Sequence, residues 1–387
     1  MSKLEHGQLA RALSAPPPAR EPGTTEPPAQ PGPLRRVLLL IGGHTGRVGG
    51  ALLRLLAAER RRLLAEQRVD FHVVGAVNRR AIQWRDPDSA WREDKVARGR
   101  DDWPEIIHRF RSYLGPKLFV DCSASPEISG HYAGFLQNGI GIVTPNKLAN
   151  SGSQRQYREL QAMAELLRLP YRYETTVGAA LPLLGALADL RASGDQLLRI
   201  EAVLSGTLSF IFQRLNHGTP FSVAVSEARD AGYTEPHPAE DLKAQDSARK
   251  LLILLREAGI ALEPRDVRVQ GLSPPALDAE SDPERYLVGL ADHDAEWAVR
   301  VESARKQGLR LACLAEFDGR EAKVGPTQIP AADAFAQLAA GENLVRVWTK
   351  RYQPVPLTIA GPGAGTEVTA AGLLTDLIKA ATGSRRV

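Results

Sequence analysis

Acidic and basic side chains that could transfer a proton gather in one short segment. The segment AGYTEPHPAEDLKAQDSARK, residues 231–250, begins with turn-forming residues, collects four carboxylates and ends on two basic residues. We expect one helix to begin at Glu240 or Asp241 and to continue through SARKLLILLREAG. On that helix Asp246 and Lys250 are four residues apart and share a face. This spacing fits either a surface ion pair or an active site in which the lysine transfers protons.

A glycine-rich loop near the start of the chain is a second candidate for chemistry. The run RRVLLLIGG, residues 35–43, predicts a buried strand, and GRVGGALLRLLAAERRRLLAE predicts a helix. Between them, Gly43, Gly46 and Gly49 recur every third residue. His44 stands where the usual GxGxxG pattern has its first glycine. Glycines at such a turn let the backbone approach a pyrophosphate at the helix N-terminus, which favours dinucleotide binding over an ordinary glycine turn.

The end of the second predicted strand bears on the choice of dinucleotide. VDFHVVGAVN, residues 69–78, is rich in β-branched residues and is followed by Arg79 and Arg80. An acid at this place would hold the ribose hydroxyls of NAD, whereas an arginine can pair with the 2′-phosphate of NADP. We therefore expect NADP to be preferred to NAD, although two ordinary surface arginines would look the same in the sequence.

The order of predicted elements indicates an α/β fold in two parts. Up to about residue 170, strands alternate with helices, and KLFVDCSAS and GIGIVTPNK predict two further strands, which is typical of a Rossmann-type, doubly wound parallel sheet. After that the pattern changes. Short β-like runs between residues 267 and 355, among them LRLACLAEF and NLVRVWT, predict a second sheet of α+β type. The final LTIAGPGAGTEVTAAGLLTDLIKAAT predicts a strand, a glycine turn and a helix that return to the first sheet.

Composition narrows the class of protein. The chain has 387 residues, of which 43% are hydrophobic, enough for a globular core. Its net charge is only +4, and no block of five like charges occurs, so nucleic-acid binding is not indicated. The apolar runs are too short to span a bilayer, and two cysteines without a CxxC pair fit a reducing cytoplasm. Residues 1–33 include a proline-dense stretch, and we expect them to form a disordered tail.

Motifs spread along the chain resemble the homoserine dehydrogenase family. They are, in order, VTPNKLAN, YETTVGAALPLL, LSGTLSFIFQRL, AGYTEPHPAEDLKAQDSARKLLIL and GPGAGTEVTAAGLLTDL. The resemblance runs from about Val37 to the C-terminus, and TPNK and GYTEP…DL…D.ARK are specific to this family. It implies interconversion of L-homoserine and L-aspartate 4-semialdehyde in threonine, methionine and isoleucine biosynthesis, with NAD(P) carrying the hydride.

The resemblance implies roles at the reacting group. Reduction of an aldehyde leaves a developing alkoxide that needs a proton donor, and a lysine is already charged at neutral pH. Lys250 would be the main acid and base. Lys147, at the end of a predicted strand, would orient the carbonyl beside the nicotinamide, and Asp246 would lie near the reacting hydroxyl.

The resemblance also implies the binding residues. Glu235 and Asp241 would bind the amino group of the substrate, because a buried ammonium needs anionic partners. Further substrate contacts would come from Tyr233, Gly206 and Thr207. The cofactor set comprises Gly43, Thr45, Gly46, Arg47, Val48, Gly49, Arg79, Ser123, Ser125, Lys147, Gly363 and Gly365. A monovalent cation, expected to be Na+, would be held by Glu174 and the backbone carbonyls of Val177, Ala179 and Leu181, unless this loop is only a turn with a capping glutamate.

Domain organisation and assembly are also expected to follow the family. Residues 34–168 with 354–387 would form the dinucleotide-binding domain, and residues 169–353 an inserted α+β domain for substrate binding and dimerisation. We expect a homodimer in the cytoplasm. We expect no aspartate kinase module before this fold and no regulatory domain after Val387, and therefore no feedback control by threonine through such a domain.

Two other functions are compatible with the residues. A phosphorylating semialdehyde dehydrogenase needs a nucleophilic cysteine, and Cys122 in VDCSAS is the candidate, although it also fits a small buried residue. A catalytically silent NADP-binding regulator would need only the glycine loop. Phosphate dependence and sensitivity to thiol alkylation would favour the first function, and cofactor binding without turnover would favour the second.

Overall fold

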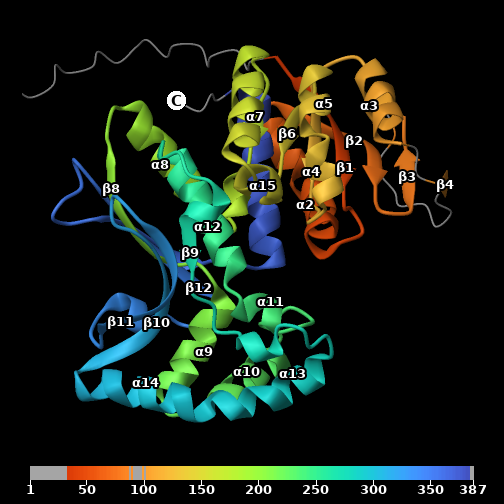
Figure 1. Cartoon of the computed structure of the whole chain (residues 1–387). Helices are drawn as coiled ribbons and strands as arrows, with labels where there is room; N and C mark the ends of the chain where they lie inside the picture. Colours follow the sequence, from red (N-terminus) through yellow and green to blue (C-terminus); the bar gives the residue numbers. More distant parts are fainter. Residues whose placement is uncertain (1–32, 87–88, 90–97, 100–101, 384–387) are drawn as a thin grey trace, which may run out of the picture. The chain divides into compact units, whose positions relative to one another are not determined.

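The computed structural model describes residues 33–86, 89, 98–99 and 102–383, and these residues build two sheets with their helices (Figure 1). The expected disordered tail, residues 1–33, therefore lies outside the described residues except for Pro33. Within the described part of the chain, no helix combines the length and the apolar character needed to cross a membrane.

The first sheet has seven strands in the order β4-β3-β2-β1-β5-β6-β7. They are β1 (Arg35–Gly42), β2 (Val69–Val77), β3 (Ala81–Trp84), β4 (Arg98–Gly99), β5 (Lys117–Asp121), β6 (Gly141–Val143) and β7 (Tyr171–Arg172). The parallel strands are β1, β2, β5, β6 and β7. At one edge, β3 pairs antiparallel with β2, and β4 pairs antiparallel with β3. The expected Rossmann-type sheet is confirmed. The strand order reverses at β1, which has β2 on one side and β5 on the other. Sheets of this type bind ligands at their carboxyl edge next to such a reversal.

Helices cover both faces of the first sheet. They are α2 (Arg47–Arg62), continued by a π-helical turn η1 (Leu63–Gln67), α3 (Trp103–Ser112), α4 (Pro126–Gly130), α5 (Tyr132–Gln137), α6 (Leu148–Ser151), α7 (Gln154–Leu166) and α15 (Thr366–Thr382). On β1, Val37, Leu39 and Ile41 share a core with α2 and α15. Leu38 and Leu40 belong to the core on the opposite face. Because both faces are covered, β1 reads as an unbroken apolar run rather than an alternating one.

The second sheet has six strands in the order β13-β12-β8-β10-β11-β9, which confirms the expected second sheet of α+β type. Its strands are β8 (Leu197–Val203), β9 (Val267–Val269), β10 (Leu309–Phe317), β11 (Ala322–Pro330), β12 (Glu342–Thr349) and β13 (Leu357–Pro362). The associated helices are α8 (Leu183–Ala192), α9 (Gly206–Asn216), α10 (Phe221–Asp230), α11 (Ala239–Leu242), α12 (Gln245–Glu257), α13 (Pro283–Gly289) and α14 (Asp294–Lys306). Short 3-10 turns are η2 (Glu174–Thr176), η3 (Pro264–Asp266), η4 (Pro275–Leu277), η5 (Leu290–His293) and η6 (Ala334–Gln337). Helices α9, α12 and α14 pack against β10 on one face.

The C-terminal strand differs from expectation. We expected strand, turn and helix to return together to the first sheet, but β13 pairs antiparallel with β12 in the second sheet. Val345 lies opposite Ile359 in this pairing, and both are apolar residues of the core side. Only α15, which packs against α2 and β1, belongs to the first sheet.

The single helix expected over residues 240–258 is also wrong. The chain forms α11 and α12 instead, separated at Ala244, whose φ of 55° is left-handed. The carbonyl of Leu242 accepts a hydrogen bond from the N–H of Leu272, at 2.6 Å, rather than one from a following helical turn. A contact with a distant segment therefore ends α11 and lets α12 start in a new direction.

Candidate active site

Two lysine side chains, one near in the sequence and one distant, meet at the carboxylate of Asp246. Oδ2 of Asp246 lies 2.9 Å from Nζ of Lys250, and Oδ1 of Asp246 lies 3.3 Å from Nζ of Lys147. The contact expected from the spacing of Asp246 and Lys250 is present, and Lys147 joins it from the first sheet. Lys250 is the least exposed of the three, with 12% of its side chain accessible against 29% for Lys147 and 49% for Asp246.

Backbone geometry places each of these side chains. Lys147 is the N-cap residue of α6, four residues after β6 ends, at the carboxyl edge of the first sheet. Asp246 lies in the first turn of α12, and Lys250 follows one turn later. Nζ of Lys250 also donates to the carbonyl of Leu204, at 2.7 Å, directly after β8 ends. The cluster therefore joins the first sheet, α12 and the end of β8.

The charge state of Asp246 follows from its neighbours. The half-buried position of this carboxyl group opposes its ionisation, but the charges of Lys250 and Lys147 and their hydrogen bonds outweigh that effect. The pKa of Asp246 is therefore held well below its usual value, and the group is a carboxylate at neutral pH. An ionised Asp246 can hold two ammonium groups side by side, where both can face one oxygen atom of a ligand.

A second carboxylate, Asp241, organises the loop before α11. Its Oδ1 lies 3.1 Å from the hydroxyl of Thr207, and its Oδ2 accepts a hydrogen bond from the N–H of Glu235 at 2.8 Å. The same hydroxyl of Thr207 donates to the carbonyl of Tyr233 at 2.6 Å. Burial raises the pKa of Asp241, and the charges of Glu235 and Asp246 act in the same direction. The expected substrate residues Tyr233, Glu235, Asp241 and Thr207 thus form one connected group.

The turn between β1 and α2 needs its glycines. Gly43 has a φ of 74°, and a Cβ there would lie 3.0 Å from the backbone of Cys122. A Cβ on Gly49 would lie 2.5 Å from the carbonyl oxygen of Gly43, closer than the turn allows. Gly46 is the N-cap residue of α2 and has no side chain to cap the first N–H groups of the helix. The turn, which also contains Thr45, Arg47 and Val48, therefore fits the pyrophosphate of a dinucleotide.

The other expected cofactor residues at this edge have different surroundings. Arg79 is exposed directly after β2, where Asn78 closes the turn to β3 with its side-chain oxygen. Ser123 and Ser125 follow β5, but their hydroxyls already bond within the protein. The Ser123 hydroxyl donates to Oδ1 of Asp121 at 2.6 Å, and the Ser125 hydroxyl caps α4. An incoming cofactor would therefore meet loops that are held by internal hydrogen bonds.

The second glycine turn lies beside the expected substrate residues. A Cβ on Gly363 would overlap the side chain of Asn343, with 1.9 Å to its Cγ, so glycine is required there. The N–H of Gly363 donates to the carbonyl of Gly341 at 3.1 Å, and a Cβ on Gly206 would lie 3.1 Å from Cα of Gly341. Gly365, with a φ of 131°, is the N-cap residue of α15. Gly341 therefore connects the turn before α15 to the start of α9.

The loop proposed for a cation shows capping contacts. Oε1 of Glu174 accepts a hydrogen bond from the N–H of Leu184 at 2.6 Å, and Oε2 accepts one from the N–H of Gly185 at 2.8 Å. Glu174 thus caps α8, as the alternative interpretation of this loop requires. The carbonyl of Leu181 accepts a hydrogen bond from the N–H of Leu183. These oxygens keep lone pairs that the capping hydrogen bonds do not use.

Sequence reasoning missed Arg256, which joins the two elements that carry the lysines. Arg256 lies on α12, is 2% exposed, and donates to the carbonyls of Asn150 at 2.7 Å and Gly152 at 2.8 Å. Both acceptors lie at or just beyond the end of the short helix that starts after Lys147. The available signal was an arginine within the apolar run LLILLREAG. Another missed residue is the buried Asp121 at the end of β5.

Comparison with known protein families identifies the family to which this chain belongs. A family model described as homoserine dehydrogenase matches residues 182–378. The chain belongs to the homoserine dehydrogenase family. A second model, described as the homoserine dehydrogenase NAD binding domain, matches residues 45–174. The first match includes Asp246 and Lys250, and the second includes most of the glycine turn and Lys147.

Curated relatives in the homoserine dehydrogenase family are longer than this chain. The bifunctional aspartokinase/homoserine dehydrogenase 2 of Zea mays is 37% identical over 344 residues, which are 87% of this chain and 38% of the relative. The bifunctional aspartokinase/homoserine dehydrogenase of Haemophilus influenzae is 35% identical over 348 residues, which are 88% of this chain and 42% of the relative. The chain therefore spans less than half of each relative.

Solved structures share the fold of this homoserine dehydrogenase family member. A Candida auris protein of unknown function is 31% identical, with a TM-score of 0.82, over 90% of this chain and 98% of that one. A hyperthermophilic archaeal homoserine dehydrogenase in complex with NADPH has a TM-score of 0.66 at 22% identity, over 89% of this chain and 97% of that one. The likeness covers both sheets.

Cys122 is not arranged as a nucleophile in this homoserine dehydrogenase fold. It follows β5 directly and packs against the core beneath α2 and α15. Burial, together with the charge of Asp121, raises the pKa of the Cys122 thiol well above its usual value. A nucleophilic cysteine needs the opposite shift, toward the thiolate. The site therefore disfavours the phosphorylating dehydrogenase as an alternative function.

Proposed function

We propose that the protein is an NADP-dependent homoserine dehydrogenase, which interconverts L-homoserine and L-aspartate 4-semialdehyde in threonine, methionine and isoleucine biosynthesis. The observation that carries this proposal is the bridging of Lys147 and Lys250 by Asp246. Two ammonium groups held at one carboxylate can stabilise the oxygen of an aldehyde as it becomes an alkoxide. Membership of the homoserine dehydrogenase family supports the same reaction.

The proposed chemistry divides between the two lysines. When bound, the dinucleotide supplies or accepts the hydride. Lys250 donates the proton to the alkoxide oxygen during aldehyde reduction and removes it during homoserine oxidation. Lys147 donates a hydrogen bond to the same oxygen and so orients the carbonyl. Asp246 holds both ammonium groups at 2.9 and 3.3 Å and thereby fixes their separation.

Substrate recognition is assigned to the loop organised by Asp241. Glu235 and Asp241 are proposed to bind the ammonium of homoserine, since two carboxylates can satisfy its donors. Tyr233, Thr207 and Gly206 are proposed as further contacts, because Thr207 bonds to Asp241 and Gly206 precedes it at the start of α9. These contacts would place the amino end of the substrate at Glu235 and Asp241, and its hydroxyl end would then face Asp246 and Lys250.

NADP is proposed as the preferred dinucleotide. The pyrophosphate would lie at the first turn of α2, where Gly43 and Gly49 leave the needed space. Arg79 is exposed at the end of β2, where it can pair with a 2′-phosphate. The turn with Gly363 and Gly365 would lie close to the cofactor. An archaeal homoserine dehydrogenase of the same fold binds NADPH, which agrees with this choice.

A monovalent cation, Na+, is proposed for the loop between η2 and α8. Glu174 and the backbone carbonyls of Val177, Ala179 and Leu181 would provide hard oxygen ligands. Because Glu174 already caps α8, the cation would stabilise the loop rather than take part in catalysis. Activity that rises with Na+ at constant ionic strength would support the site.

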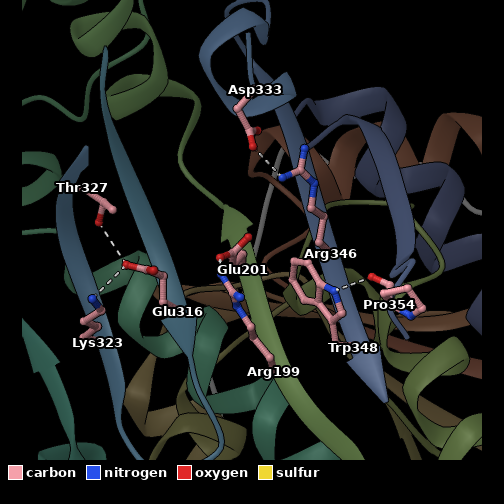
Figure 2. A network of polar contacts seen from close by, with 9 residues as sticks. All are labelled: Arg199, Glu201, Glu316, Lys323, Thr327, Asp333, Arg346, Trp348 and Pro354. Carbon is pink, nitrogen blue, oxygen red and sulfur yellow. Dashed lines mark hydrogen bonds and ion pairs between the residues drawn. The ribbon is translucent and has the colours of Figure 1, made fainter. Parts of the chain in front are cut away.

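A homodimer is proposed, formed through the second sheet. One face of this sheet is covered by α9, α12 and α14, and charged side chains from four strands lie close together on the other face (Figure 2). Glu316 there lies 3.3 Å from Lys323, and Arg346 lies 2.9 Å from Asp333. Leu314 and other apolar residues on the same face form a small core that is buried within the chain, with Phe335 of η6 among them. A sheet face whose charges are already paired within the chain suits contact with a second copy.

We retain two further proposals about organisation. Residues 34–168 would bind the cofactor and residues 169–353 the substrate and second subunit, with β13 assigned to the second sheet and α15 to the first. The cytoplasm is the proposed compartment, because Cys122 and Cys313 are both free thiols.

Nicotinamide absorbance tests the proposed reaction directly. Purified protein would be mixed with L-homoserine and NADP or NAD, in sodium or potassium buffer. Homoserine-dependent reduction that is faster with NADP is expected. Absence of turnover with both dinucleotides, from folded protein, would contradict the proposal. Turnover of aspartate semialdehyde that requires phosphate would instead identify the phosphorylating dehydrogenase, and NADPH binding without any turnover would identify a silent regulator.

A further inference from the structure

A buried carboxylate lies directly beneath the proposed catalytic edge of the first sheet. Asp121, the last residue of β5, is 0% exposed. Its Oδ1 accepts hydrogen bonds from the N–H of Ser123 at 2.8 Å and from the Ser123 hydroxyl at 2.6 Å. Its Oδ2 accepts hydrogen bonds from the hydroxyl of Tyr132 at 2.7 Å and from Nδ2 of Asn146 at 3.0 Å. Four donors from three parts of the chain thus converge on one side chain.

Three of these four donors belong to the two loops that carry proposed functional residues, and the fourth, the Tyr132 hydroxyl, lies on α5. Ser123 lies in the loop after β5, which also contains Ser125, and its hydroxyl accepts a hydrogen bond from the N–H of Ser125 at 3.2 Å. Asn146 lies in the loop after β6 and immediately precedes Lys147. Its Nδ2 also donates to the carbonyl of Ser125 at 3.1 Å, and its Oδ1 accepts from the N–H of Leu148 at 3.0 Å. Asp121 and Asn146 therefore hold the cofactor loop and the lysine loop together.

The chemistry of this network requires an ionised acid. Only a carboxylate can accept four hydrogen bonds without presenting a donor of its own. Burial raises the pKa of Asp121, and the hydrogen bonds from Ser123, Tyr132 and Asn146 act against that shift. An uncharged residue would avoid the cost of burying a charge, so stability alone does not explain a carboxylate at this position.

We propose that Asp121 is a positioning residue, which acts through Asn146 on Lys147 and through Ser123 on the loop that receives the nicotinamide ribose. Asp121 itself touches neither substrate nor cofactor. Asp121 sets the distance between the cofactor loop and Lys147, which orients the carbonyl. Both the loop and Lys147 therefore move when the carboxylate of Asp121 is lost. This inference rests on the proposed function for its kinetic part, and its binding part stands without it.

The test uses Asp121→Asn with Asp195→Asn as a matched control. Asp195 is 7% exposed and accepts a hydrogen bond from the hydroxyl of Thr349 at 2.7 Å, just before β8 begins. Leu204, the carbonyl partner of Lys250, lies beyond the other end of the seven-residue β8, so Asp195 is about 20 Å or more away along the strand. Both substitutions keep the shape of the side chain and replace one acceptor oxygen with a donor.

Four quantities are measured for each variant: the Kd for NADPH from cofactor fluorescence, the kcat and the KM for homoserine, and the Tm. For Asp121→Asn we expect kcat to fall about ten- to hundredfold and the Kd for NADPH to rise several-fold, because both loops shift. The KM for homoserine should stay near the wild-type value, since Asp241 and Glu235 lie outside the network. Asp195→Asn should leave all three kinetic and binding constants unchanged.

Tyr132→Phe provides a second variant in case Asp121→Asn does not fold. It removes one donor, keeps the carboxylate, and should lower kcat and weaken NADPH binding in the same direction but less. Wild-type kinetics and wild-type NADPH affinity in both variants, or in Tyr132→Phe alone if only that variant folds, would overturn the proposal. Equal kinetic losses in Asp195→Asn would overturn it too, because they would indicate general destabilisation. If wild-type protein binds NADPH but does not oxidise homoserine, the proposed function fails, while the Kd comparison still decides the role of Asp121.

Discussion

Lys250 is the residue on which the proposed proton transfer depends. Its ammonium group has three donors, and two of them are directed at the carboxylate of Asp246 and the carbonyl of Leu204. The third donor remains for the oxygen of a substrate. These two acceptors hold the Lys250 side chain in one position. Because 12% of the side chain is exposed, its ammonium group can still reach a substrate.

Replacing Lys250 by alanine should remove most of the activity. We expect kcat to fall by about 10²- to 10⁴-fold, because the proton donor is lost, while the Kd for NADPH stays unchanged. Steady-state kinetics and cofactor fluorescence measure the two quantities. The matched control is Lys243→Ala, since Lys243 pairs only loosely with Glu240, at 3.6 Å. Near-normal turnover in Lys250→Ala would exclude this lysine as the acid and base.

Asp246 predicts a specific dependence of stability on pH. Its pKa is lowered in the folded protein, so its contribution to stability is present above the ordinary pKa of an aspartate. That contribution is lost as the pH falls from the ordinary value toward the lowered one. Urea unfolding of wild type and Asp246→Asn should therefore differ most near neutral pH and converge below about pH 4. A difference that does not vary with pH would show that the ion pairs with the lysines contribute no pH-dependent stability.

Helix α2 shows how one element serves the cofactor site. Two adjacent glycines in its first turn look alike in the sequence but have different surroundings. A Cβ on Gly49 would meet the carbonyl oxygen of Gly43 at 2.5 Å, whereas a Cβ on Gly50 would meet nothing closer than 3.7 Å. The helix therefore approaches the turn closely at Gly49 alone, and this approach shapes the proposed pyrophosphate site.

Alanine at these two positions should have opposite effects. Gly49→Ala forces the turn to move, and we expect a loss of about 1–3 kcal/mol in the free energy of unfolding together with weaker NADPH binding. Gly50→Ala should be neutral or raise stability by up to about 1 kcal/mol, because alanine favours helix over glycine. Thermal unfolding and cofactor titration check both. Equal effects of the two substitutions would contradict the close approach at Gly49.

At the scale of the whole molecule, the proposed site exists only because the two sheets and their helices meet. Lys147 comes from the carboxyl edge of the first sheet, and Asp246 and Lys250 come from α12, which packs on the second sheet. Arg256 reinforces this meeting, since its contact with Asn150 joins α12 to α6. The opposite face of the second sheet, which carries Glu316 and Arg346, is the proposed contact with a second copy (Figure 2).

A charged side chain placed on that face should disrupt the dimer. Ala360 is exposed on β13, opposite Leu344 of β12, which belongs to the small buried core on this face. We expect wild-type protein to have twice the mass of one chain by light scattering, and Ala360→Arg to shift it toward a monomer. Ala298→Arg is the control, because Ala298 is exposed on α14, on the other side of the sheet. Two variants with the same mass as each other would exclude this interface.

Local patterns predicted much of the fold. The alternation of strands and helices, the glycine turn after β1 and the contact of Asp246 with Lys250 all follow from neighbours in the sequence. Resemblance to the homoserine dehydrogenase family added the roles of Lys147 and of the loop with Glu235. The roles of Asp121 and Arg256 stayed hidden, because an acid at a strand end and an arginine in an apolar helix have many explanations until their partners are known.

The amino-acid sequence by itself determined those features that depend on residues a few positions apart: a strand buried on both faces, a helix that needs glycine at its start, and a carboxylate one turn before a lysine. Tertiary structure decided the rest. It broke the expected helix at Ala244, because the carbonyl of Leu242 found the N–H of Leu272. It moved β13 to the second sheet and brought Lys147 to Asp246. These outcomes depend on contacts between distant segments, which a local pattern does not encode.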